Sequence, residues 1–392
     1  MFALCACLCR SAPAFEVFDG LQVHGFLSQG YFLTTNNSLF GSSERGGSLD
    51  FTELGVNASW MLRSDLQLAV QLLSRRAGEA AENEPELDFA LLDYTALATA
   101  DRRLGVRVGR VRLPFGLYGD TRDVAFTRPS ILLPQSIYFD ESRELAISGD
   151  GAMFYGEEHS PWGNFLLEVG PFSPRVDNDN SEVAILGVPQ RGHLAGRLSF
   201  IGRLIYEAPI GGLRLAVTGA RFESGYRPRP PDKFGPGDDL FEPLILSAQY
   251  DAEAWSLTGE YARRRVADEN FAPGFDFDIV GDSYYVQGIY RWDPYLEIVV
   301  RYDALFFNED DRDGTQFKVA NPGIPAHTQF AKDWTAGVRY NITPSVMVRA
   351  EYHHVYGTAW LFQQDQVGFP NDPFSSTDKK WDLFALLVSY RF

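Results

Sequence analysis

The stretch Thr52-Glu-Leu-Gly-Val-Asn-Ala-Ser-Trp-Met-Leu-Arg63 alternates in side-chain character almost residue by residue. Its even positions carry Thr52, Leu54, Val56, Ala58, Trp60 and Leu62, and its odd positions include Glu53, Gly55, Asn57, Ser59 and Arg63. Because successive side chains of an extended chain point to opposite faces, this period of two predicts a β-strand with one apolar and one polar face. Ser64-Asp65 then predicts a tight turn, and the alternation resumes from Leu66.

The same pattern recurs along the chain, and we count sixteen predicted strands in all. Besides this hairpin, regular segments lie at about 194–207, 213–222, 243–251, 254–264, 283–292, 295–305, 332–342, 345–354 and 381–392, and less regular ones at 21–33, 86–98, 102–113, 144–156 and 162–170. Seven short turns such as Ser64-Asp65 alternate with eight long loops, of which the third spans about 114–143. This alternation predicts an up-and-down antiparallel sheet with one plain rim and one rim of long loops.

Strand length and polarity favour a membrane barrel over a soluble sandwich. About 11 residues at ~3.3 Å each, tilted by ~40°, span roughly 25–28 Å, which is the height of an outer-membrane hydrocarbon band. The apolar faces would meet lipid, whereas a sandwich would have to bury the Arg and Glu side chains of the polar faces. No apolar run approaches the roughly 18 residues of a spanning helix. We therefore predict an all-β fold, a 16-stranded antiparallel transmembrane β-barrel.

Aromatic residues of the predicted strands fall at two levels. Those near the short turns are Trp60, Tyr250, Trp255, Tyr290, Trp292, Tyr340, Tyr390 and Phe392, and those near the opposite edge are Tyr261, Tyr302, Trp334, Tyr352 and Phe384. Amphipathic rings prefer both membrane interfaces, so two girdles support the barrel.

The first fourteen residues differ from the rest of the chain. They hold all three cysteines in an apolar run that ends near Ala12-Pro13-Ala14, which predicts a signal peptide over 1–14, although no basic residue precedes the run. A lipoprotein site at Cys7 is the less favoured alternative. Cleavage would leave a cysteine-free barrel domain, 15–392, suited to an oxidising compartment. The net charge of −17 argues against nucleic acid as a partner.

Two features carry a family resemblance. One is Gly109-Arg-Val-Arg-Leu-Pro-Phe-Gly116, followed by Arg128-Pro129-Ser130 and by Pro134-Gln-Ser-Ile-Tyr138. The other is the last predicted strand, in which Phe384, Tyr390 and the terminal Phe392 share a face, as in the assembly signal that ends outer-membrane barrels. The chain resembles the Gram-negative outer-membrane porins related to the phosphate-selective porins O and P.

This resemblance implies a homotrimer in the outer membrane of a Gram-negative bacterium, with the third long loop inserted into the lumen. It also implies contact with lipid and lipopolysaccharide, and folding by the barrel assembly machinery. Phosphate specificity does not follow automatically, because in that family it depends on runs of Arg and Lys, whereas this chain is acidic.

The predicted channel is lined by charges of both signs. Candidate constriction residues of the inserted loop and its approach are Arg110, Arg112, Asp120, Arg122, Asp123 and Arg128, and candidate lumen-lining residues are Glu53, Arg107, Arg197, Arg203, Glu297, Arg301, Asp303, Arg339, Arg349 and Glu351. Opposed charges across a narrow pore set a transverse field and a weak selectivity. The mixture does not determine whether cations or anions are favoured.

We therefore expect passive diffusion of ions and small hydrophilic solutes through a water-filled channel. A substrate-specific channel for phosphate or another anion is the alternative. A barrel enzyme is less favoured because the sequence contains no recognisable catalytic constellation, and an adhesin with a plugged lumen is also less favoured. No cofactor is expected. No metal site is expected either, since His353 and His354 point to opposite faces, and the acidic run from Glu309 lacks the closing glutamate of a calcium loop.

Overall fold

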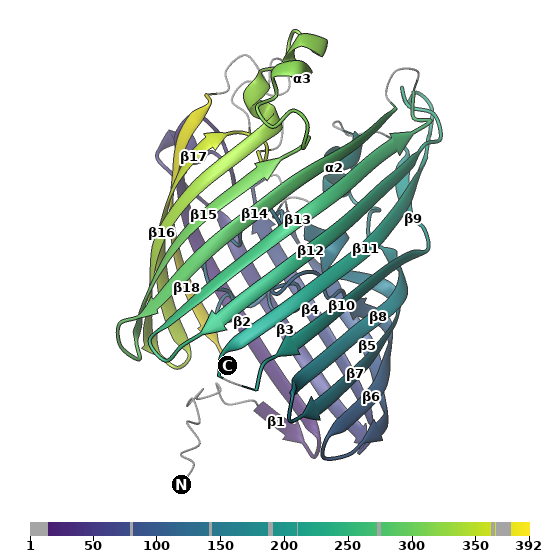
Figure 1. Cartoon of the computed structure of the whole chain (residues 1–392), viewed down its shortest axis with the longest axis vertical. Coiled ribbons are helices and arrows are strands. Elements are labelled where there is room, and N and C mark those ends of the chain that lie inside the picture. The colour runs from purple at the N-terminus through teal and green to yellow at the C-terminus, as the bar shows by residue number, and fades with distance from the viewer. Residues whose placement is uncertain are drawn as a thin grey trace.

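A closed antiparallel sheet forms the wall of the molecule in the computed structural model (Figure 1), as its strand pairings show. The structure describes residues 15–78, 81–140, 143–186, 191–209, 211–272, 276–361, 365 and 378–392. The predicted signal peptide therefore lies outside the described residues.

Sixteen strands make the ring, which confirms the predicted fold class. They are β2 (Leu21–Thr34), β3 (Ser48–Arg63), β4 (Leu66–Ala77), β5 (Glu82–Ala98), β6 (Arg102–Arg112), β7 (Ser148–Ser160), β8 (Gly163–Pro174), β10 (Ser199–Glu207), β11 (Leu213–Arg227), β12 (Asp238–Asp251), β13 (Trp255–Glu269), β14 (Phe277–Arg291), β15 (Leu296–Phe306), β16 (Phe330–Thr343), β17 (Val346–Gly357) and β18 (Lys380–Arg391). The last strand, β18, pairs with β2, so the sheet has no free edge.

Two short strands add to this ring. β1 (Phe15–Phe18), which we did not predict, pairs with β2. β9 (His193–Gly196) pairs with β11 beyond the end of β10, so the strand predicted at 194–207 is interrupted at residues 197–198.

Several strands run further toward the long loops than we predicted. β12 begins at Asp238 rather than 243, β13 ends at Glu269 rather than 264, and the loop predicted at 76–86 shrinks to residues 78–81. Hydrophobic alternation missed these extensions because their outward side chains are charged and pair with one another, as Arg265 does with Glu242 and Asp278. In the opposite direction, the strand predicted from residue 144 begins only at Ser148, since residues 143–147 form a helix.

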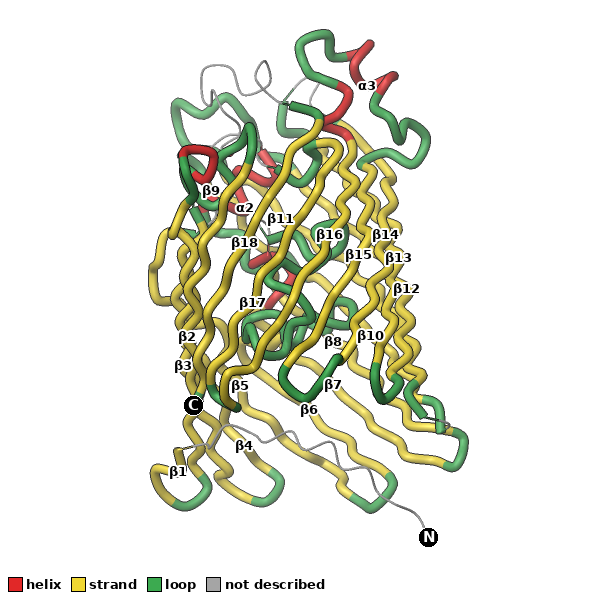
Figure 2. Tube along the Cα trace, turned by 90° about the vertical axis from the view of Figure 1, so that its left-hand side faces the viewer, coloured by secondary structure: helices red, strands yellow, loops and turns green. Residues whose placement is uncertain are grey.

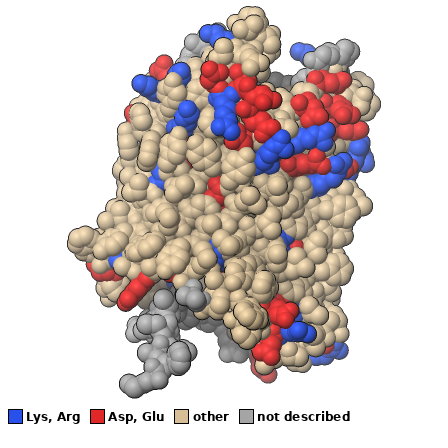
Figure 3. All heavy atoms as spheres, in the orientation of Figure 1, with Lys and Arg blue, Asp and Glu red and all other residues tan. Residues whose placement is uncertain are grey.

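The outer surface carries the predicted apolar face. Leu54 is 48% exposed, whereas its neighbour Glu53 on the inner face is 1% exposed. Figure 3 shows a band almost free of charge across the middle of the face in view, with charged side chains gathered above and below it. The rings of Tyr250 and Trp255 contact each other at the short-turn edge.

Helices are short and lie among the loops. They are α1 (Arg143–Ile147), α2 (Asp179–Leu186) and α3 (Thr315–Ala320), together with the 3-10 turns η1 (Ser43–Arg45) and η2 (Ala326–Gln329). None of the helices in the described ranges has the length and hydrophobicity needed to cross a membrane. The long connections gather at one end of the barrel and the short turns at the other (Figure 1).

Candidate functional site

The chain leaves the wall after β6 and runs through the interior of the barrel as residues 113–140, which we call the lumen segment (Figure 2). Pro114 lacks the amide proton that a continuing strand would need. Gly116 has φ +60°, and a Cβ there would come within 2.3 Å of the Tyr138 hydroxyl. The local sequence therefore ends the strand and turns the backbone inward.

Two apolar clusters fasten the lumen segment to opposite walls. Leu113, Phe115, Leu133, Ile137 and Tyr138 pack in one cluster with Phe172, Phe222 and Ile245 of β8, β11 and β12. Ala125, Phe126, Ile131 and Leu132 pack in the other with Met347, Leu383 and Ala385 of β17 and β18. The segment thus crosses the lumen rather than lying along one side of it.

Carboxylates of the wall accept hydrogen bonds from the backbone of the lumen segment. Glu260 accepts the amide of Leu117 at 3.0 Å and the hydroxyl of Tyr138 at 2.5 Å. Glu351 accepts the amide of Ile131 at 2.5 Å, and Asp303 accepts that of Ser136 at 3.3 Å. A loop without a strand partner needs such acceptors for its buried amides, and the wall supplies them.

Arginines of the wall donate to carbonyl oxygens of the same segment. The acceptors are Gly116 for Arg203 at 2.8 Å, Leu132 for Arg301 at 3.1 Å, Phe126 for Arg339 at 3.3 Å and Arg128 for Arg349 at 2.5 Å. Glu297 lies 3.5 Å from Arg339, and Arg107 pairs with Asp93 and Glu168. Most of the predicted lumen-lining charges therefore hold the lumen segment or pair with one another, which we did not foresee.

A network of buried ion pairs lies where the segment meets β3 to β6. Arg128 makes two hydrogen bonds with Glu53, at 3.1 and 2.7 Å. Arg112 contacts both Asp123 and Asp88. Asp120, at the edge of the network, pairs with Arg203 at 2.5 Å.

Two further arginines complete this network: Arg75, which the alternation of its strand already placed on the inner face, and Arg143, which we did not predict. Arg143 pairs with Asp123, and Arg75 pairs with Asp140. Arg143 was predicted only as the last residue of the third long loop, and nothing in the sequence indicated that helix α1 would turn it toward Asp123. Burial alone would raise the pKa of Asp123, but the Arg112 and Arg143 guanidiniums outweigh it and hold the pKa at about 2.

Two predicted site residues lie elsewhere. Arg110 shares the outward face of β6 with Val108 and pairs with Asp150 of β7, and Arg197 pairs with Asp238 beside Gly225 on the outer face. Both were expected inside the channel. Arg110 lies near the long-loop end of β6 and Arg197 just before β10, where outward side chains are charged too, so an arginine there no longer marks the inner face.

Arg122 belongs to the lumen segment but not to the ion-pair network. Its side chain is 3% exposed and donates to the carbonyl oxygens of Tyr138 and Phe139, at 3.4 and 3.0 Å. Among the described residues it forms no ion pair with a carboxylate. Burial and the like charge of Arg143 lower the pKa of Arg122 to about 9, so it remains protonated at neutral pH.

Known structures share this fold. No protein-family model matches the chain, and no curated protein matches its sequence. The anion-selective porin from Comamonas acidovorans is 11% identical with a TM-score of 0.58, and the alignment covers 95% of this chain and 99% of that one. The outer membrane channel DcaP of Acinetobacter baumannii is 12% identical with a TM-score of 0.58, and the alignment covers 97% of this chain and 100% of that one. OmpT, an outer membrane protein of Vibrio cholerae, is 13% identical with a TM-score of 0.56, and the alignment covers 97% of this chain and 100% of that one. At these identities the similarity establishes the fold alone: a 16-stranded porin-like barrel.

Proposed function

We propose that this protein is an outer-membrane porin of a Gram-negative bacterium, through which ions and small hydrophilic solutes diffuse passively. The observation that carries this proposal is a closed barrel with an apolar outer band and a charged inner wall, crossed by one anchored segment. An apolar exterior suits lipid, and a polar interior suits water. The named functions of the structural neighbours, porin and channel, support the same conclusion.

The lumen segment is proposed to set the size limit of the channel. Arg112, Asp120, Asp123 and Arg128 act by holding the segment in place, because each is engaged in an ion pair or hydrogen bond with the wall. Rings and clusters of fixed charge then bias which ions pass. With both signs compensated in pairs, we expect weak selectivity from this network.

Partners follow from the outer surface and the C-terminal strand. A belt of paired charges above the apolar band, including Arg221–Glu242 and Arg263–Glu309, suits the charged headgroup region of lipopolysaccharide. Phe384, Tyr390 and Phe392 lie exposed on one face of β18 and its end, as expected of a signal for the barrel assembly machinery. We propose a homotrimer, by analogy with the trimer form of OmpT.

Relatedness to the phosphate-selective porins O and P is a finer proposal, which rests on the motifs at 109–116 and 128–138. A phosphate-specific channel would need a continuous run of unpaired cations down the length of the pore. Since Arg128, Arg203 and Arg349 are bound to the lumen segment or to acids, we favour the general porin.

Recordings from purified protein in planar lipid bilayers test the proposal. We expect stepwise current increments in potassium chloride, with a small conductance because the lumen segment crosses the barrel. Insertion into the bilayer without any current would overturn it and would favour a plugged, structural barrel.

A further inference from the structure

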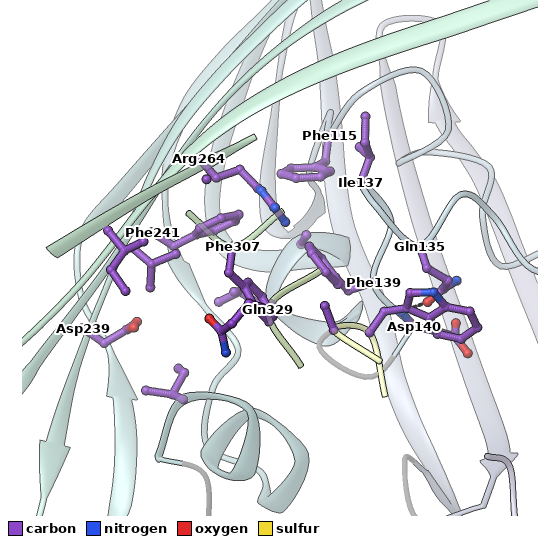
Figure 4. A pocket seen from close by; sticks show the side chains of 18 of the residues that line it. Phe115, Gln135, Ile137, Phe139, Asp140, Asp239, Phe241, Arg264, Phe307 and Gln329 are labelled. Atoms are coloured by element: carbon purple, nitrogen blue, oxygen red, sulfur yellow. Dashed lines mark hydrogen bonds between the residues drawn. The ribbon is translucent and has the colours of Figure 1, made fainter. Parts of the chain in front are cut away.

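A cavity of about 350 Å³ lies inside the barrel, on the long-loop side of the lumen segment. The lumen segment and α1 bound it on one side, and the upper parts of β12, β13 and β14 bound it on the other. Figure 4 shows side chains of these elements, among them Phe139, Phe241 and Arg264, converging on one space. A volume of this order is at the lower end of the range for small-molecule sites, roughly 300–1,000 Å³.

The lining of this cavity is mainly aromatic and apolar. Phe115 and Phe139 come from the lumen segment, Phe241 and Phe277 from β12 and β14, and Phe307 and Trp360 from the loops above. Inner walls of a channel for hydrated ions would be polar, because an apolar surface cannot replace the water around an ion. This lining instead suits a solute with a hydrocarbon or aromatic body.

Arg264 is the main charged group that points into this lining (Figure 4). Its side chain is 6% exposed, and its guanidinium carbon lies 5.2 Å from the centre of the Phe139 ring. Its guanidinium donates a long hydrogen bond, 3.5 Å, to the carbonyl oxygen of Phe306. In the described part of the chain it forms no ion pair, and the two carboxylates that attract it, Asp282 and Asp303, are already engaged by Arg312 and by the Ser136 amide. The guanidinium of Arg264 therefore faces the cavity without a direct partner of opposite charge.

The arginines beside Arg264 on the same strand are all paired. Arg263 binds Glu309 and Arg265 binds Glu242 and Asp278, both on the outer face. Arg122, from across the cavity, is buried and likewise has no carboxylate partner among the described residues. A buried cation is costly unless it is paired, so two of them at one apolar cavity point to an anionic ligand.

Acidic groups of the cavity limit which anion fits. Asp140 is already paired with Arg75, whereas Asp239 lines the cavity with Ser224 as its hydrogen-bond partner and Asp268 opposite it in register. A second carboxylate on the ligand would meet this acidic edge. The cavity therefore suits one negative charge rather than two.

We propose that this cavity binds a small aromatic monocarboxylate, whose carboxylate pairs with Arg264 and whose ring packs between Phe139 and Phe241. An arginine donates two parallel hydrogen bonds to a carboxylate, and aromatic rings stack favourably in an apolar pocket. The consequence of this binding for transport rests on the proposed porin function. Aromatic monocarboxylates would concentrate on the long-loop side of the lumen segment and slow the passage of other ions.

The test uses full-length purified protein in detergent and benzoate as the probe, with binding measured by calorimetry. We expect saturable binding of benzoate, and affinities at least about tenfold weaker for acetate, inorganic phosphate, phthalate and uncharged benzyl alcohol. Acetate and phosphate lack the aromatic ring, phthalate carries a second negative charge, and benzyl alcohol has the ring but no charge. Benzyl alcohol binding as tightly as benzoate would overturn the role of Arg264 without any variant.

Variants separate the site from the surface. Arg264→Gln should weaken benzoate binding at least tenfold, whereas Arg265→Gln, one residue away on the outer face, should leave it unchanged. Heat-dependent mobility on gels checks that both barrels fold, and Arg122→Gln is the second test if Arg264→Gln does not fold. If Arg264→Gln, or Arg122→Gln where only that variant folds, binds benzoate as tightly as wild type, the proposal is refuted.

The same protein in bilayers separates this inference from the porin function. Benzoate added on the loop side should reduce the potassium chloride current in a saturable way. Normal current with no benzoate binding refutes the site and leaves the porin function standing. Benzoate binding without any current refutes the porin function and leaves the site standing.

Discussion

The ion pair between Arg128 and Glu53 should decide how firmly the lumen segment is held, and Arg128→Met tests this. The two side chains are 4% and 1% exposed and share two hydrogen bonds. Removing one partner of a buried pair costs about 3–5 kcal/mol. Glu53 keeps Arg75 at 3.6 Å and Arg143 at 3.7 Å, so we expect the lower end, about 3 kcal/mol.

Hydrogen exchange of the segment measures this loss directly. The buried amides of Leu117 and Ile131 exchange when the segment opens locally, and about 3 kcal/mol corresponds to roughly hundredfold faster exchange. Adding Glu53→Gln should cost less than the sum of the single changes, because the two groups interact. Arg110→Met, on the outer face, is the matched control. Exchange in Arg128→Met as slow as in wild type would refute the claim that this pair anchors the segment.

Three further predictions concern the same segment. The pKa of Asp123 is lowered to about 2 by the Arg112 and Arg143 guanidiniums, so its own contribution to anchoring is complete above the ordinary value of about 3.9 and is lost as pH falls through 2; carbon NMR of the Asp123 carboxyl should show it ionised from pH 7 down to about 3, and protonation near pH 5 would contradict this. Gly116→Ala should destabilise the lumen segment by at least about 1 kcal/mol, because φ at this position is +60° and the added Cβ meets the Tyr138 hydroxyl. Faster proteolysis, or faster hydrogen exchange of amides near residue 117, would measure this loss. Arg122→Gln should shift the zero-current potential in a salt gradient toward cation selectivity, because it removes a positive charge that forms no ion pair in the described residues. The control Arg110→Gln should leave this potential unchanged, and equal potentials in wild type and Arg122→Gln would exclude Arg122 from the ion path.

Much of the wall could be predicted from the sequence because its rule is local. Alternation from Thr52 to Leu62 requires only that neighbouring side chains of a strand point to opposite faces, and lipid on one side makes that alternation hydrophobic. The same rule failed where lipid ends. Arg110 and Arg197 lie at the long-loop edge of the wall, where outward side chains are charged as well, so charge there no longer distinguishes inside from outside.

That the chain leaves the wall as the lumen segment, 113–140, was also predictable, because Pro114 and Arg128-Pro129 cannot continue a strand. The contacts of this segment with the wall were not predictable. Arg301 reaches Leu132 across 169 residues of sequence, and Arg349 reaches Arg128 across 221. No local pattern encodes which wall residue meets which loop carbonyl, because that depends on the register of the strands between them.

The sequence by itself therefore determined the strand period, the number of strands, the alternation of turns and loops, and the place where the chain leaves the wall. These depend on the local geometry of an extended chain and on its two solvents, lipid and water. Only the tertiary structure decided that the inner charges mostly bind the lumen segment, and that Arg264 is left facing an apolar cavity while Arg263 and Arg265 are paired outside. Closure of the sheet between β18 and β2 brings together residues far apart in the chain, and that geometry assigns each charge its partner.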